Sequence, residues 1–497
     1  MTAERDSISR NTGFAFAVKM TGAVFSAVLA IFLIRYLGPA EYGALALAMS
    51  VGALVFLPSD LGVAQAAARY VAEAGADRGV VAAVISDATR LKLLASGLVS
   101  IALALLAGPI ASAYDAPEIA WPLRIVAVSI FFESFLLMFD ATFQALGRVS
   151  AYLRVVVVES ASETILSIGI VLLGGGVTGA VAGRAAGYAF AAGFGLIVIA
   201  RTIRPARLTL RRGSGAGHLR HILGYGFALL IIDGTFTLFS RVDALLIGAI
   251  ISVPAVGLYE APARLMAFLG YLGQSISSGV APRMARTAAG EPNRDALQLG
   301  LRIMVVVQGV FLAPLVVWAE PMTQLVLGPG YEESAQVLRA LAPFAFMIGI
   351  SPMLALSVNY LGEARRRVPI AIAALLINAA IDVALLGQIG IVAGAIGTDI
   401  AYGFYVAAHL LILRALIGLA LRPIAVGIGR SLIAAAAMAG VLALIGTGEV
   451  ALGLLILGAL VGPFVYVLAL LAVRAVTPAE LRQAAGRVRG MLRPSAT

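Results

Sequence analysis

The chain has 497 residues, of which 61% are hydrophobic and only 12% are charged, and its formal net charge is +10. These values exclude an ordinary soluble domain, in which about a quarter of the residues are charged. Cysteine is absent and histidine occurs three times, which excludes disulfide frameworks and argues against a zinc site. The composition therefore predicts an all-α integral membrane protein.

Fourteen apolar runs follow one another along the chain. Each is close to the length of about 20 residues that spans a bilayer as a helix. The first run follows Arg5 and Arg10 and is longer than the apolar region of a cleavable signal peptide, so we expect it to be retained. The expected spans lie near residues 11–34, 43–66, 91–112, 119–143, 154–173, 177–200, 221–250, 255–280, 298–319, 336–360, 368–387, 391–413, 424–446 and 450–473.

The loops between these spans alternate in charge. With the N-terminus in the cytoplasm, the inward loops and the C-terminal tail carry arginine, whereas the outward loops carry chiefly acids such as Asp115, Glu118 and Glu320. Arginine and lysine collect in cytoplasmic loops. We therefore expect a multi-pass protein of the inner (cytoplasmic) membrane with both termini in the cytoplasm. We expect the scattered arginines to contact membrane lipids and no nucleic acid.

The sequence repeats itself at a constant offset of 215 residues. The offset joins four separate segments and pairs Pro39 with Pro254, Arg124 with Arg339, Gly147 with Gly362, and Gly179 with Gly394. Each repeat holds six spans, and because six is even, both halves have the same orientation in the membrane. The pattern predicts two parallel six-helix repeats followed by two extra C-terminal helices.

The repeat divides the chain into two lobes. The longest polar interruption, which contains Gly213-Ser214-Gly215, is expected to link them in the cytoplasm. The expected parts are an N-terminal lobe (1–200), a linker (201–220), a C-terminal lobe (221–414), spans thirteen and fourteen (415–473) and a basic cytoplasmic tail (474–497).

Short motifs of glycine, proline and single charges recur at the ends of the spans. They are Arg35-Tyr-Leu-Gly-Pro-Ala-Glu-Tyr-Gly43, Asp60-Leu-Gly62, Arg241-Val-Asp-Ala-Leu-Leu-Ile-Gly248, Val256-Gly-Leu-Tyr259, Tyr331 with Val337-Leu-Arg339, and Asn378 through Asp382 to Gly390-Ile-Val-Ala-Gly-Ala395. In order and spacing they resemble the polysaccharide transporter family. This family comprises the O-antigen-type lipid-linked oligosaccharide flippases of the multidrug/oligosaccharidyl-lipid/polysaccharide exporter superfamily. The resemblance covers nearly the whole chain.

The resemblance implies two six-helix lobes around a V-shaped central cavity that opens alternately to the two sides of the membrane. It implies a flippase for a polyprenyl-pyrophosphate-linked oligosaccharide, with glycosyltransferases and a polysaccharide polymerase as partners. A lipid II flippase and a cation-coupled exporter of drugs or small amphiphiles are the alternatives. Spans thirteen and fourteen favour a lipid-linked substrate, because they offer added surface for a lipid tail or a partner enzyme.

Ionisable side chains within the spans are the candidate binding residues, because such groups usually face a bundle interior or a water-filled cavity. In the implied fold, the first two helices of each lobe line the cavity. These helices carry Lys19, Asp60, Arg241, Asp243 and Arg264. Arg241 and Arg264 are expected at similar depth, where two guanidinium groups would clamp a pyrophosphate.

Each of these candidates also has a structural interpretation. Arg264 would pair with Asp243 or Glu260 and hold two helices together. Asp60, at a weak point of its helix, would accept hydrogen bonds from released backbone donors, or it would bind a proton or a cation. Lys19 faces either the cavity or another surface of its helix.

A second set of charges is expected to act in coupling or gating. It consists of Asp233, Glu163, Arg184, Asp382 and Asp399. The repeat offset pairs Arg184 with Asp399, which would form a salt bridge between the lobes that breaks during transport. Pairing within one lobe, as between Arg184 and Glu163, is the simpler alternative.

The sequence contains no catalytic constellation, so we expect a transporter and not an enzyme. A phosphate-binding Gly-x-x-x-x-Gly-Lys-Ser/Thr loop is absent, and the outward loops are too short for the external loop of a membrane glycosyltransferase. We expect no cofactor and no metal site. Acids outnumber bases within the expected spans, which allows coupling to protons or sodium ions.

Overall fold

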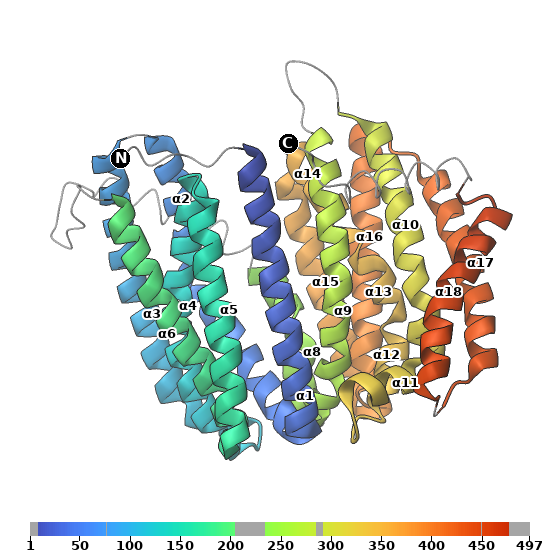
Figure 1. Cartoon of the computed structure of the whole chain (residues 1–497), viewed down its shortest axis with the longest axis horizontal. Helices are drawn as coiled ribbons and strands as arrows, with labels where there is room; N and C mark the ends of the chain where they lie inside the picture. Colours follow the sequence, from blue (N-terminus) through green and yellow to red (C-terminus); the bar gives the residue numbers. More distant parts are fainter. Residues whose placement is uncertain (1–7, 76, 204–233, 285–291, 449, 477–497) are drawn as a thin grey trace. The chain divides into compact units, whose positions relative to one another are not determined.

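The structure is a computed structural model that describes residues 8–75, 77–203, 234–284, 292–448 and 450–476. In these ranges every regular element is a helix (Figure 1). Ten helical segments of the described chain are long and apolar enough to cross a membrane. The prediction of an all-α, multi-pass membrane protein is therefore confirmed.

Two of these ten segments each contain two expected spans. In α1 (Ile8–Asp60) the helix is interrupted at Gly38, whose φ is 69°. In the same way α5 (Val149–Ile170) continues into α6 (Gly176–Ile203) through Gly174, whose φ is 90°. Glycine adopts such angles at little cost, so these spans join without a loop. The count of fourteen spans remains a prediction.

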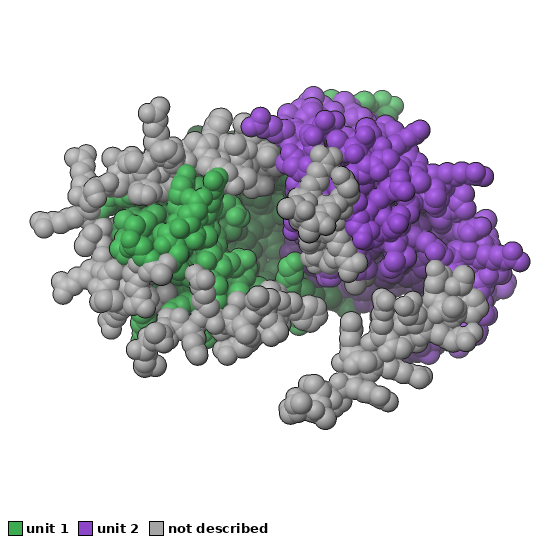
Figure 2. Space-filling view, turned by 90° about the horizontal axis from the view of Figure 1, so that it is seen from above, with its two compact units in different colours: residues 1–260, 382–391 green, residues 261–381, 392–497 purple. Residues whose placement is uncertain are grey.

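The chain forms two compact units, which Figure 2 shows in different colours. Unit 1 comprises residues 1–260 and 382–391, and unit 2 comprises residues 261–381 and 392–497. The five expected domain parts remain predictions. Most of the expected linker (residues 204–220) and most of the expected tail (residues 477–497) lie outside the described residues.

Unit 1 is built from the N-terminal helices, the short segment that follows them and the end of α15. Besides α1, α5 and α6, its helices are α2 (Val63–Ala74), α3 (Arg78–Ala113), α4 (Ala120–Ala145), α8 (Val242–Ile250) and the beginning of α9 (Val253–Val280). Unit 2 contains the rest of α9, α10 (Arg294–Val317), α11 (Ala319–Met322), α12 (Ser334–Ala340), α13 (Ala342–Ile348), α14 (Ser351–Tyr360), most of α15 (Arg367–Ile389), α16 (Val392–Ile417), α17 (Leu421–Ile445) and α18 (Leu452–Ala472).

Helix α4 lies at the centre of unit 1 and packs against α1, α2, α3 and α6. Phe135, Phe139 and Phe143 follow one another at intervals of four residues, so they share one helix face and join the buried core. Glu133 lies on the same helix but reaches a cavity. The helix that anchors the core thus also supplies a charge to the site described below.

Glycines set the close packing of α5 against α6. A Cβ atom on Gly183 would lie 2.3 Å from the backbone of Ser167, and one on Gly187 would lie 2.5 Å from the backbone of Glu163. Small residues four apart allow membrane helices to approach this closely. The approach places Glu163 of α5 beside Arg184 of α6.

In unit 2, the last two helices are fixed to α10 by polar contacts. The hydroxyl groups of Ser431 on α17 and Tyr466 on α18 are 2.6 Å apart, and Tyr466 donates to the carbonyl of Val306 on α10 at 2.9 Å. Gly309 leaves the space for this contact, because a Cβ there would lie 2.1 Å from the Ser431 hydroxyl. Spans thirteen and fourteen are therefore integral to unit 2.

The internal repeat is visible in the hydrogen bonds that end α4 and α14. After α4, the amide of Gly147 donates to Gln144 and that of Arg148 donates to Phe143. After α14, the equivalent amides donate to carbonyls at the same offset, Gly362 to Asn359 and Glu363 to Val358. Both glycines have positive φ, 67° and 80°, as this helix-terminating turn requires. The turn thus recurs where the duplication predicts it.

Candidate functional site

A cavity of about 310 Å³ lies within unit 1. Its lining residues come from α1, α4, α6 and the segment that leads into α8. Most of the wall is apolar, but four charged side chains reach it, namely Asp60, Glu133, Arg184 and Arg241. Three of these residues are among the candidates predicted from the sequence, and Glu133 is not. The sequence gives no signal for Glu133 beyond an acid near the middle of an apolar span.

Arg184 is held by two carboxylates. Its Nη1 lies 2.8 Å from Oε1 of Glu163, and its Nη2 lies 3.6 Å from Oε2 of Glu133. The guanidinium carbon also lies 4.5 Å from the centre of the Tyr188 ring, where a cation is attracted to the ring face. The pairing of Arg184 with Glu163 inside one lobe is confirmed. The role of these two residues in coupling or gating remains a prediction.

Arg241 stands at a break in the expected seventh span. A turn at Ser240 precedes it, and the amide of Leu245 donates to its carbonyl, so Arg241 begins α8. Its half-buried side chain lines the cavity and is attracted electrostatically to Glu133. The cavity therefore contains two guanidinium groups, from Arg184 and Arg241, with Glu133 as a shared counter-charge.

Asp60 occupies the junction between α1 and α2, where Leu61 and Gly62 have positive φ angles of 48° and 67°. Its Oδ1 accepts a hydrogen bond from the amide of Ala64 at 3.4 Å. This bond confirms the structural interpretation, in which Asp60 satisfies backbone donors that the helix break releases. Asp60 also lines the cavity, and its role in binding remains a prediction.

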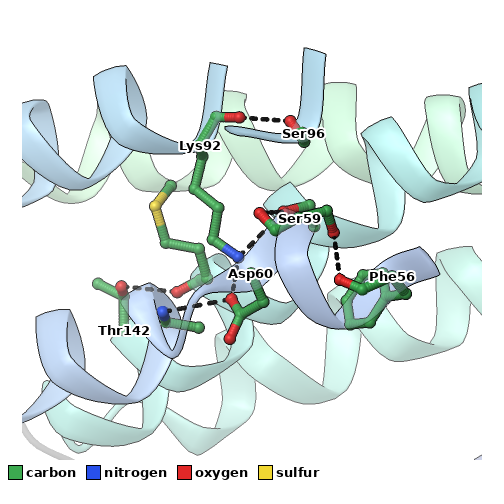
Figure 3. A network of polar contacts seen from close by, with 9 residues as sticks. Phe56, Ser59, Asp60, Lys92, Ser96 and Thr142 are labelled. Carbon is green, nitrogen blue, oxygen red and sulfur yellow. Dashed lines mark hydrogen bonds and ion pairs between the residues drawn. The ribbon is translucent and has the colours of Figure 1, made fainter. Parts of the chain in front are cut away.

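Lys92 is the main partner of Asp60 (Figure 3). Its ammonium group donates to Asp60 Oδ1 and, at 3.0 Å, to the hydroxyl of Ser134 on α4, and the lysine is fully buried. Lys92 is not among the candidates predicted from the sequence, because it is the second residue of an expected span and lies two residues after Arg90. A lysine in that position is usually an interfacial charge.

Asp243 and Asp382 come together in unit 1. Asp382 is fully buried and interacts electrostatically with Asp243, which accepts a hydrogen bond from the Tyr259 hydroxyl. Two neighbouring buried carboxylates cannot both be ionised at low cost. Sequence analysis placed Asp243 with the binding residues and Asp382 with the coupling residues, and the structure places them in one pair.

The other candidates lie away from this cavity. Lys19 is exposed on α1, and Arg264 is half-buried on α9 in unit 2. Asp399 of α16 accepts a hydrogen bond from the amide of Phe344 at 2.8 Å. An acid in this position stabilises the start of α13. Asp233 lies outside the described residues, and the roles of these four residues remain predictions.

Comparison with known proteins identifies relatives in polysaccharide synthesis. The profile of a family described as "Polysaccharide biosynthesis protein" matches residues 32–336, more than half of the chain. Over 143 residues the chain is 24% identical to the "Putative O-antigen transporter" of Escherichia coli (strain K12). That match covers 28% of this chain and 34%, about a third, of the relative.

Solved structures of transporters share the fold. The structure titled "Lipid II flippase MurJ, inward closed conformation" superposes with a TM-score of 0.75 at 13% identity, over 92% of this chain and 98% of that chain. An inward-facing multidrug resistance MATE family transporter of the MOP superfamily superposes with a TM-score of 0.63 at 15% identity, over 81% and 98% of the two chains. These similarities confirm the transporter fold that the sequence motifs imply.

Proposed function

Because the chain belongs to the polysaccharide biosynthesis protein family, we propose that it is a flippase of the inner (cytoplasmic) membrane. It carries a polyprenyl-pyrophosphate-linked oligosaccharide from the cytoplasmic leaflet to the outer leaflet, and both of its termini lie in the cytoplasm. The cycle is alternating access, in which a binding site opens first to one side of the membrane and then to the other.

The observation that carries the proposal is the pair of guanidinium groups in the unit 1 cavity. Arg184 and Arg241 line one space of about 310 Å³, and guanidinium binds phosphate oxygens through paired hydrogen bonds. The pyrophosphate of the substrate would bind there, next to the hydroxyl group of Ser129, which also lines the cavity. The lipid tail would remain in the bilayer.

The Asp243–Asp382 pair supports coupling of this cycle to a cation. Two neighbouring buried carboxylates repel each other when both are ionised, so they are more stable with one proton between them. Release of that proton to one side of the membrane changes the charge of this buried site by one unit, and a sodium ion that binds in its place restores the charge. The energy of such a change is large inside a membrane protein, which suits a driving ion.

The test is translocation in proteoliposomes. A labelled polyprenyl-pyrophosphate-oligosaccharide is placed in one leaflet, and its appearance in the other is followed for the wild type, Arg241→Ala and Arg366→Ala at equal protein levels. Arg366 is the control, because it pairs with Glu363 on the surface of unit 2. The proposal predicts translocation by the wild type and the control and a loss in Arg241→Ala.

Two results would contradict the proposal. If the wild type moves no lipid-linked oligosaccharide but exports a cationic dye when an ion gradient is applied, the protein is a drug exporter. If it moves lipid II and no other lipid-linked glycan, it is a lipid II flippase.

A further inference from the structure

Glu133 and Glu163 bind the same arginine but differ in their surroundings. Glu163 lies 2.8 Å from Arg184 and is not one of the described residues that line the cavity. Glu133 lies 3.6 Å from Arg184 and lines the cavity. The Glu133 side chain is 34% exposed and that of Glu163 is 17% exposed. Glu163 therefore fixes one end of the guanidinium, and Glu133 covers the end that faces the cavity.

Glu133 also interacts with the second cavity arginine, Arg241. A carboxylate attracted to both guanidinium groups occupies the region in which an anionic ligand would bind. Carboxylate and phosphate present similar oxygen acceptors to arginine. A phosphate group that enters the cavity must therefore compete with Glu133 for Arg184 and Arg241.

The basic groups around Glu133 do not outnumber the acidic ones before any ligand binds. The groups on the surrounding elements are Asp60 on α1, Lys92 on α3, Glu159 and Glu163 on α5, Arg184 and Tyr188 on α6, and Arg241 before α8. With Glu133 ionised, the three bases are matched by Asp60, Glu133 and Glu163, and Glu159 adds a further acid. A phosphate anion would give this weakly solvated region a net negative charge, which is unfavourable.

We propose that Glu133 is an internal substitute for the phosphate of the ligand, and that the anion binds together with one proton. The phosphate oxygens replace the Glu133 carboxylate at Nη2 of Arg184 and at Arg241. The displaced carboxylate takes up a proton from water and becomes neutral, so that it no longer repels the ligand. This inference rests on the proposed function and adds that the headgroup site takes up a proton with its anion.

The chain contains no native cysteine, so a single introduced cysteine is the only thiol that a reagent can label. Thr237 lines the cavity four residues before Arg241, so a Thr237→Cys chain reports on this site. The labelling rate of this cysteine by a thiol reagent is measured in the full-length protein between pH 6 and pH 8, with increasing inorganic pyrophosphate. Ratios of rates with and without pyrophosphate remove the pH dependence of the thiol itself, and comparison between variants removes that of pyrophosphate.

In the Thr237→Cys chain, we expect the affinity for pyrophosphate to rise as the pH falls, by up to about tenfold per pH unit, the limit for one linked proton. Adding Glu133→Gln, which is neutral at every pH, should reduce this change to less than about twofold per unit and tighten binding at pH 8. Glu133→Asp and the exposed surface variant Glu118→Gln should both keep the slope of the parent.

Three outcomes would overturn the inference. If Glu133→Gln keeps the slope of the parent, or binds pyrophosphate more weakly at every pH, Glu133 is not the displaced group. If Glu133→Gln does not fold, the parent alone still tests the inference, because a pyrophosphate affinity in the Thr237→Cys chain that does not change with pH also overturns it. Each of these results leaves the proposed flippase activity intact, whereas failure of pyrophosphate to protect the cysteine in any variant overturns both the inference and the headgroup site.

Discussion

Two cavities of similar volume, one in each unit, differ completely in their lining. The unit 1 cavity has a volume of about 310 Å³, and four of its 15 lining residues are charged. The second cavity, of about 370 Å³, lies in unit 2 among α10, α11, α17 and α18, and none of its 14 lining residues is charged. Only the first can neutralise an anion, and the second offers hydrocarbon contacts alone.

The contrast separates two ways of stabilising a membrane cavity. In unit 1, buried ion pairs hold the wall, as between Lys92 and Asp60. In unit 2, the indole of Trp318 does so, because its N–H donates to the carbonyl of Gly446 at 3.0 Å while its ring packs against Gly458. Substitutions that alter one cavity wall at a time distinguish the two.

The largest effect is expected for Lys92→Met. Loss of the ammonium group leaves the Asp60 carboxylate without its buried partner, which lowers the free energy of unfolding by about 3–5 kcal/mol. Thermal unfolding in detergent measures this effect. Lys19→Met is the matched control, because the exposed Lys19 is the other lysine in the chain. Equal unfolding midpoints for the two variants would show that the pair contributes nothing to stability.

Arg241→Ala tests the charged wall itself. Loss of a charged, paired hydrogen-bond donor weakens binding by about 1.5–3 kcal/mol, so we expect affinity for pyrophosphate to fall by roughly 10- to 150-fold. Arg241→Lys keeps the charge but not the planar fork and should show an intermediate loss. Protection of the cysteine at position 237 by increasing pyrophosphate gives the affinities of Arg241→Ala, Arg241→Lys and the chain that keeps Arg241. Unchanged affinity in Arg241→Ala would remove this residue from the site.

Gly458→Ala tests the apolar wall. A Cβ at this position would lie 2.1 Å from the Trp318 ring, so α18 must shift, and we expect the free energy of unfolding to fall by about 1–3 kcal/mol. Pyrophosphate binding should not change. Gly453→Ala on the same helix is the control, because nothing lies within 4 Å of its Cβ position. A loss of pyrophosphate affinity in Gly458→Ala would contradict the separation of the two cavities.

The smallest effect is expected for Ala459→Phe, which adds a ring to the unit 2 cavity from its exposed side. Because the new ring remains in apolar surroundings, the affinity for pyrophosphate should stay within about twofold of the wild type. The unfolding midpoint should stay within a few degrees of the wild type. Translocation of the lipid-linked substrate is the informative measurement. A strong decrease with normal pyrophosphate binding would assign the apolar cavity to the lipid tail, which is one of the two roles that the sequence offers for spans thirteen and fourteen, the other being contact with a partner enzyme.

The sequence predicts the membrane class and the transporter fold well, because both follow from patterns within single segments. The length of the apolar runs indicates the helices. The order of the glycine and proline motifs indicates the family, and the offset of 215 residues predicts that the turn at Gly147 recurs at Gly362. The pairing of Arg184 with Glu163 was the simpler of two alternatives, and it joins α5 and α6, which are neighbours in sequence.

The charge partners between distant helices could not be predicted. Lys92 and Asp60 are 32 residues apart, and periodicity relates only residues on one helix. Glu133 has no charged counterpart in the repeat, because the offset places Ile348 opposite it. The break before Arg241 was missed as well, because residues 221–250 are apolar enough on average to be taken as one span despite Asp233, Arg241 and Asp243. These contacts depend on packing, which a single sequence does not specify.

The most direct measurement compares cysteine protection in the two cavities. Thr237→Cys in the charged cavity and Leu325→Cys in the apolar cavity are labelled with a membrane-permeant maleimide, with and without pyrophosphate. If the charged cavity of unit 1 is the headgroup site, pyrophosphate slows labelling at position 237 and leaves position 325 unchanged. Equal labelling at position 237 with and without pyrophosphate would contradict the account.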